Sequence, residues 1–107
     1  MYGRAMVLLS LLGAMQAYPS WADDNVLRGK FTFNWSKAPD RQKCTQIGPA
    51  LIAKFTSPGF HCDLTIQTNT ASGVATSYCT DKSSQYMIFA TRVDCEKERT
   101  TQAANED

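Results

Sequence analysis

The sequence predicts a small two-layer α+β domain in which one helix packs on a four-stranded, mainly antiparallel sheet, in the order β-α-β-β-β. Three observations support this fold class. Apolar and polar residues alternate in several short runs, as in half-buried strands. One run between the first two strands has helical spacing instead. Four cysteines occur in a chain of only 107 residues, so two disulfides can stabilise a small core.

The N-terminal segment, residues 1–22, has the organisation of a secretory signal peptide. Arg4 supplies the positive charge, and residues 5–15 form an apolar run that is too short to span a bilayer. Ser20 and Ala22 are small residues placed as a cleavage site requires. We therefore expect export to the periplasm or beyond the cell, and a single folded domain formed by residues 23–107.

The first strand is expected at residues 30–35, where aromatic side chains alternate with polar ones. A helix is expected to begin near Pro39, because the apolar residues that follow recur at intervals of three or four. Its apolar face would consist of Cys44, Ile47, Leu51 and Phe55. Gly48 and Pro49 interrupt the pattern, so this helix is either kinked or divided into two short helices.

Three more strands are expected at residues 61–68, 74–80 and 85–95, with turn sequences between them. Their short connections favour an antiparallel meander. Residues 96–107 are mostly polar and are expected to form a polar C-terminal tail, either a frayed helix or a disordered segment. This order of elements resembles the cystatin-like arrangement of a helix wrapped by an antiparallel sheet. The resemblance implies a fold alone, since the Gln-x-Val-x-Gly signature of cystatin inhibitors is absent from the sequence.

The four cysteines are Cys44, Cys62, Cys79 and Cys95, and none is close enough to another for the paired spacing of a zinc site. We therefore expect disulfides and no metal. If the turn after the second strand is centred between residues 70 and 71, Cys62 lies opposite Cys79. Cys44 on the helix would then bond to Cys95 on the last strand. A shift of that turn by one residue would favour Cys44–Cys62 with Cys79–Cys95 instead.

The charges and motifs exclude several classes of function. With 11 basic and 10 acidic residues the chain lacks the excess positive charge of a nucleic-acid-binding protein. The sequence contains no nucleotide-binding or hydrolase signature. His61 and Asp63 share one face of a strand, but Cys62 points to the other face and cannot act as their nucleophile. We therefore expect no catalytic activity and no cofactor.

One sheet face is a candidate for binding a partner. If the helix covers Met87 and Phe89, the residues expected on the opposite face are Tyr78, Tyr86, Ile88, Arg92 and His61. Tyrosine and arginine are enriched where proteins contact one another. This face is therefore a candidate for contact with another protein; the alternative is that its side chains pack across strands and only stiffen the sheet, or are covered by the C-terminal tail.

The leading functional hypothesis is an exported, non-enzymatic protein-binding module, such as a small inhibitor or immunity-type protein of a bacterial periplasm. A disulfide-linked scaffold suits this role because it loses little conformational entropy on docking. The alternative is a structural or accessory subunit of a cell-envelope or secretion assembly. A third hypothesis is a small secreted hydrolase or toxin that uses His61 and Asp63.

Overall fold

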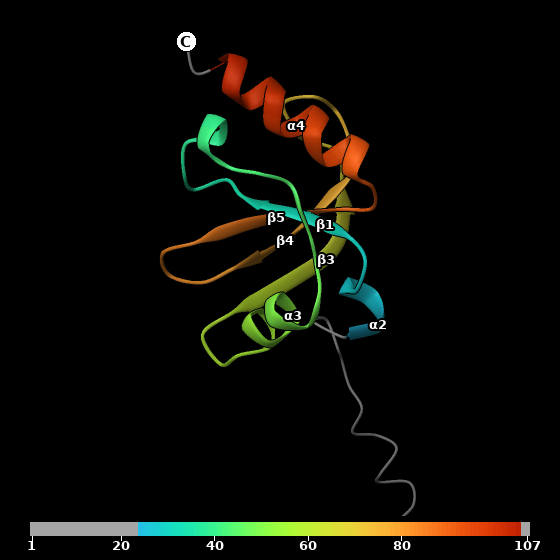
Figure 1. The fold of residues 1–107 in the computed structure, drawn as a ribbon, viewed down its shortest axis with the longest axis vertical. Coiled ribbons are helices and arrows are strands. Elements are labelled where there is room, and N and C mark those ends of the chain that lie inside the picture. The colour runs from blue at the N-terminus through green and yellow to red at the C-terminus, as the bar shows by residue number, and fades with distance from the viewer. Residues whose placement is uncertain (1–23, 106–107) are drawn as a thin grey trace, which may run out of the picture.

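The computed structural model describes residues 24–105, so the predicted signal peptide at residues 1–22 lies outside the described part. A five-stranded antiparallel sheet forms the centre of the fold, with α4 at one end and α3 at the other (Figure 1). The elements are α2 (Asp24–Leu27), β1 (Phe31–Asn34), the 3-10 turn η1 (Pro39–Arg41), β2 (Thr45–Gln46), α3 (Pro49–Phe55), β3 (His61–Gln67), β4 (Thr76–Thr80), β5 (Gln85–Phe89) and α4 (Arg92–Asn105).

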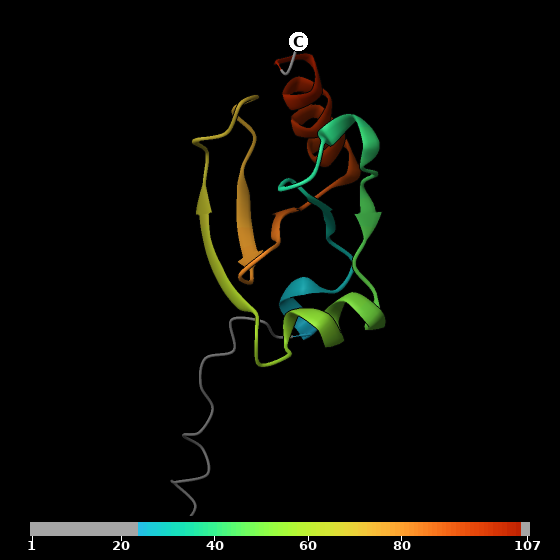
Figure 2. The ribbon, with the colours of Figure 1, turned by 90° about the vertical axis from the view of Figure 1, so that its left-hand side faces the viewer.

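The order of strands across the sheet is β2-β1-β5-β4-β3. The meander expected for the last three strands is present as β3, β4 and β5. β1 joins it by pairing with β5, so the first long strand lies beside the last. Figure 2 shows the two margins of the sheet, with β3 on one side and β2 on the other. The α+β class is confirmed, and the number of strands is larger than expected by one.

The additional strand, β2, lies in the segment that was expected to be helical. Helix α3 begins only at Pro49, with Gly48 extended just before it, and it ends at Phe55 after two turns. Proline is well suited to the first position of a helix and poorly suited to its interior. Because the helix cannot extend backward through Pro49, Thr45 and Gln46 remain extended and pair with β1. A continuous helix from Pro39 to Phe55 is therefore wrong. Of the alternatives, the division at Gly48 and Pro49 is the nearer one, with the short 3-10 turn η1 before the interruption and α3 after it.

The end of the chain also differs from the expectation. The last strand, expected at 85–95, ends at Phe89, and the 14-residue helix α4 follows. The side-chain hydroxyl of Thr91 accepts a hydrogen bond from the backbone N–H of Asp94 at 3.1 Å, which satisfies a donor at the start of the helix. Of the two alternatives for the polar segment 96–107, a frayed helix or a disordered tail, the structure has a helix, which begins at Arg92 and continues to Asn105. The long helix of this fold is thus C-terminal, unlike the helix of the cystatin-like arrangement expected from the order of elements.

The sheet buries apolar side chains on both faces. The cluster on the face covered by α2 and α3 consists of Leu27, Ile47, Phe55, Cys62, Cys79 and Ile88. The cluster on the face covered by α4 consists of Phe33, Cys44, Met87, Phe89 and Cys95. A strand with helices on both faces must bury residues at both phases of its alternation. This explains why Met87, Ile88 and Phe89 are buried in succession.

Two disulfides join Cys62 to Cys79 and Cys44 to Cys95. Cys62 and Cys79 are opposite each other on β3 and β4, as the turn position had suggested. The second bond connects different elements from those expected: Cys44 lies in the extended segment before β2, and Cys95 lies on α4. This bond therefore attaches the C-terminal helix to the margin of the sheet.

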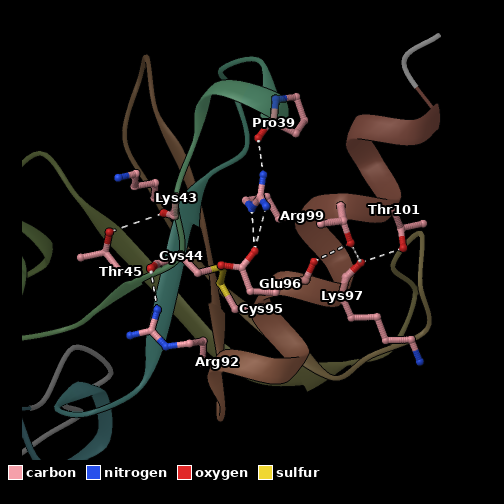
Figure 3. Close-up of polar contacts among 11 residues, drawn as sticks. Pro39, Lys43, Cys44, Thr45, Arg92, Cys95, Glu96, Lys97, Arg99 and Thr101 are labelled. Carbon is pink, nitrogen blue, oxygen red and sulfur yellow. Dashed lines mark hydrogen bonds and ion pairs between the residues drawn. A yellow bond between two sulfur atoms is a disulfide. The ribbon is translucent and has the colours of Figure 1, made fainter.

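Two arginines of α4 reinforce this attachment (Figure 3). Arg92 donates a hydrogen bond to the carbonyl oxygen of Cys44 at 3.3 Å. Arg99 donates to the carbonyl oxygen of Pro39 at 3.1 Å and also pairs with Glu96. The two arginines thus donate to backbone carbonyl oxygens of residues 39 and 44, which lie outside the strands of the sheet.

We expect the Cys44–Cys95 bond to contribute more stability than Cys62–Cys79. Replacing Cys44 and Cys95 by serine should lower the free energy of unfolding by about 4 kcal/mol, against about 3 kcal/mol for Cys62 and Cys79, because the closed loops span 51 and 17 residues. Urea unfolding followed by circular dichroism measures both losses. A larger loss for Cys62 and Cys79 would contradict this ranking.

Peptide mapping of the protein without reduction checks the disulfide pairing. Recovery of a peptide in which Cys44 is joined to Cys62 would contradict the pairing described above.

Candidate functional site

The five residues expected to form one partner-binding face lie on different surfaces. Tyr78 is opposite Met87 in the sheet and belongs to the face covered by α4. Tyr86 is opposite Cys79 and belongs to the face covered by α3. Ile88 is only 2% exposed, so it is part of the core. The expected grouping is wrong because it placed Tyr78 of β4 on the same face as Tyr86 of β5. In the sheet Tyr78 pairs with Met87, one residue further along β5, and a shift of one residue moves a side chain to the other face.

Tyr86 and Arg92 have internal partners. The ring of Tyr86 packs edge-on against Phe55, with 5.0 Å between centroids, and its hydroxyl accepts a hydrogen bond from Lys54 at 2.9 Å. The guanidinium of Arg92 lies 4.8 Å from the centre of the Phe31 ring, in addition to its bond with the backbone of the 39–44 segment. Both side chains therefore fix α3 or α4 to the sheet.

His61 is exposed on β3, and it lies on the same strand face as Asp63, as the alternation indicated. Asp63 is opposite Tyr78 and accepts a hydrogen bond from the backbone N–H of Thr65 at 3.1 Å. This bond, more than the nearby imidazole of His61, lowers the pKa of the Asp63 carboxyl. The five candidate residues thus divide between the two faces: His61 and Tyr78 lie on neighbouring strands of one face, whereas Tyr86 and Ile88 lie together on the face covered by α3.

A cavity of about 290 Å³ opens beside Tyr78, between the sheet and α4. It is lined by Trp35, Asn69, Thr70, Ala71, Tyr78, Met87, Glu98 and Gln102. The rings of Trp35 and Tyr78 are tilted by 53°, with 6.4 Å between their centroids. Trp35 is 39% exposed, so this aromatic pair forms the accessible wall of the cavity.

Glu98 is buried, at 1% exposure, and forms the charged part of this lining. One carboxylate oxygen accepts from the backbone N–H of Ser72 at 2.8 Å and from its hydroxyl at 2.6 Å. The other accepts from the backbone N–H of Ala71 at 3.1 Å and from the Gln102 amide at 2.7 Å. Burial raises the pKa of Glu98, but these hydrogen bonds, led by that of the Ser72 hydroxyl, outweigh it and leave the pKa lowered.

The charge of Glu98 also acts on its neighbour in the cavity. The pKa of the Tyr78 hydroxyl is raised, first by its partial burial and then by the negative charge of Glu98. Tyr78 therefore remains a neutral hydrogen-bonding group, and the space beside it has a negative potential.

Sequence reasoning missed this cavity because it placed Glu98 in a solvated tail. The inward side of α4 contains the buried Cys95 and Glu98 and the half-buried Gln102, at spacings of three and four residues. The spacing is helical, but two of the three side chains are polar, so no apolar periodicity marks the helix. The combination of Thr91 with Asp94 three residues later was the available signal for a helix start.

Comparison with known proteins finds no matching family model, no similar curated protein and no similar solved structure.

Residues 24–105 include no helix long and apolar enough to cross a membrane. Within the same residues, histidine, cysteine and acidic side chains form no group of three or more that could hold a metal ion. Any function must therefore be argued from the surfaces and the cavity themselves.

We expect Glu98 to make the fold sensitive to acid. Since its pKa in the folded state lies below the ordinary value of 4.5, the ionised carboxylate stabilises the fold at neutral pH, and this contribution is lost as the pH falls through the lowered pKa. Glu98→Gln should therefore lower the free energy of unfolding by about 1–3 kcal/mol at neutral pH. The difference in the free energy of unfolding between the variant and the wild type should become smaller towards pH 3. Urea unfolding of both proteins at a series of pH values measures this difference.

Glu96→Gln is the matched control on the same helix. The Glu96 side chain is 40% exposed and forms a surface ion pair with Arg99, so its loss should cost less than about 1 kcal/mol. Asp63 and Asp81 also have lowered pKa values and contribute acid dependence to every variant, so the difference between variants is the informative quantity. Equal losses for both variants at every pH would contradict the role assigned to Glu98.

Proposed function

We propose that the chain is an exported binding protein that recognises another protein and catalyses no reaction. The observation that carries this proposal is the outer edge of β3, the seven-residue strand at the margin of the sheet. Within residues 24–105, β3 pairs with β4 alone. A strand edge presents alternating N–H and C=O groups, and an added polypeptide strand satisfies them best. This favours a protein as the partner.

The side chains along β3 fit a selective edge. His61 and Asp63 are exposed on one face, and Ile66, at 66% exposure, offers an apolar contact. The pairing with β4 is irregular between Asp63 and Gln67. Such irregularities, together with charged side chains, restrict indiscriminate pairing between sheet edges. The edge is therefore suited to a partner of matched register rather than to self-association.

Two further features support export and stable binding. The signal-peptide pattern at residues 1–22 directs a chain across the membrane, and two disulfides persist in an oxidising compartment. The Cys62–Cys79 bond joins β3 to β4, so it holds the proposed binding edge in shape before a partner arrives.

Affinity capture with a matched pair of variants tests this proposal. The oxidised protein is immobilised, envelope and culture extracts are passed over it, and retained proteins are identified by mass spectrometry. Ile66→Lys puts an ammonium group on the strand edge, a charge that natural proteins use to block edge pairing. We expect it to reduce retention of the partner at least about tenfold, which corresponds to about 1.4 kcal/mol. The control is Val93→Lys, because Val93 is 75% exposed on α4.

Three outcomes are informative. Loss of a stoichiometric partner with Ile66→Lys and its retention with Val93→Lys would support the proposal. The partner's identity would then separate an inhibitor from a subunit of an envelope assembly. Equal retention by both variants would reject β3 as the binding edge. An activity of the protein that His61→Ala abolishes, with the fold intact, would replace the binding role with the hydrolase hypothesis.

A further inference from the structure

The cavity beside α4 combines an aromatic wall with a buried negative charge. Trp35 and Tyr78 meet at 53° and so present two π faces that form a corner. Met87 and Gln102 belong to the lining near α4, where the Gln102 amide donates to the Met87 sulfur at 3.4 Å. The π faces carry negative electrostatic potential where a cation would approach. The wall therefore favours a positively charged ligand over a neutral or anionic one.

The charge of Glu98 is retained within the protein. Its four hydrogen bonds come from the amides of Ala71 and Ser72, the Ser72 hydroxyl and the Gln102 side chain, all of which are neutral groups. Neutral donors stabilise a carboxylate without cancelling its charge. A cation in the cavity would therefore gain Coulomb energy in a partly desolvated site.

The same hydrogen bonds select the kind of cation. A carboxylate accepts about four hydrogen bonds, and those of Glu98 are already in use. A primary ammonium entering the cavity would lose hydrogen bonds to water without gaining new ones from Glu98. A quaternary ammonium has no N–H groups to satisfy, and its methyl groups suit aromatic faces.

We propose that the cavity bounded by Trp35, Tyr78 and Glu98 binds a quaternary ammonium group. The volume of about 290 Å³ is at the small end of ligand pockets, so the group belongs to a compact molecule or to an exposed headgroup. Aromatic side chains around a quaternary ammonium are a general mode of recognition in proteins. This proposal concerns the face covered by α4 and is independent of the β3 edge.

Choline is the probe for the free form of this ligand. The sequence has only two tryptophans, so in the full chain carrying Trp21→Phe the emission reports on Trp35 alone. We expect choline to change this emission in a saturable way in the millimolar range or below. Its neutral carbon isostere, 3,3-dimethyl-1-butanol, should bind at least about tenfold more weakly, and ethanolamine should bind more weakly than choline.

Variants then test the assigned residues by calorimetry. Tyr78→Leu keeps an apolar side chain but removes the π face, and we expect it to weaken choline about fivefold. Glu98→Gln should weaken the binding of choline further, whereas the affinity of this variant for the neutral isostere should equal that of the wild type. Because Glu98→Gln also affects the fold, Trp35→Leu at a partly exposed position is the second variant, with a similar loss expected. Val93→Ala, on the exposed side of α4, is the control and should leave binding unchanged.

Vesicles distinguish the two sources of the group. Sedimentation with phosphatidylcholine vesicles, and not with phosphatidylglycerol vesicles, would place the quaternary ammonium on a lipid. Binding of free choline alone would place it on a small molecule. The proposal is overturned if choline and its isostere bind within twofold of each other, or if neither choline nor phosphatidylcholine binds.

Discussion

The fold depends on the buried charge of Glu98. A carboxylate can be removed from water only where donors replace its hydration, and here the donors come from the loop between β3 and β4 and from α4 itself. The need for these hydrogen bonds fixes the loop against the helix. An apolar residue at this position would pack with less positional precision, because the hydrophobic effect has no preferred direction. The loop at residues 71–72 and the middle of α4 are thus positioned relative to each other by one side chain.

The remaining attachments of α4 connect it to a different part of the chain from the one that Glu98 contacts. The Cys44–Cys95 bond and the arginine contacts connect its first turns to the segment that precedes β2. Glu98 connects its middle to the loop at residues 71–72. A helix with a mostly polar sequence has little apolar area to bury, so covalent and charged contacts must supply the attachment. None of these attachments of α4 reaches β3, whose Cys62 packs instead against Phe55 of α3 on the other face of the sheet.

The parts of the fold that follow from alternation could be predicted from the sequence. The strands at 61–67, 76–80 and 85–89 and the placing of Cys62 opposite Cys79 all depend on local patterns that the structure contains. The sequence could not exclude a helix that begins at Pro39. Cys44 and Ile47 are both buried and lie three residues apart, as on one face of a helix, although the segment that contains them is extended. The position of Pro49 was the better guide, since proline favours the first turn of a helix.

The candidate site was harder to predict, for a physical reason. Its residues come from Trp35 after β1, Tyr78 on β4 and Glu98 on α4, which are brought together only by strand order and by the packing of α4. Because β5 is covered on both faces, its alternation does not reveal which side is accessible. Tyr78 was therefore grouped with Tyr86, although the sheet separates them.

The position of β1 in the sheet determines the order in which the fold can assemble. β1 has only β2 and β5 as neighbours, and Thr32 pairs with Ile88 across most of the chain. The β3–β4–β5 meander consists of local pairings, which form with little loss of chain entropy. A chain emerging from the ribosome therefore holds β1 without its main partner until nearly all of the sequence has been made. β1 can pair locally with β2, but only the late strand β5 can join that pair to the meander and make a single sheet of five strands.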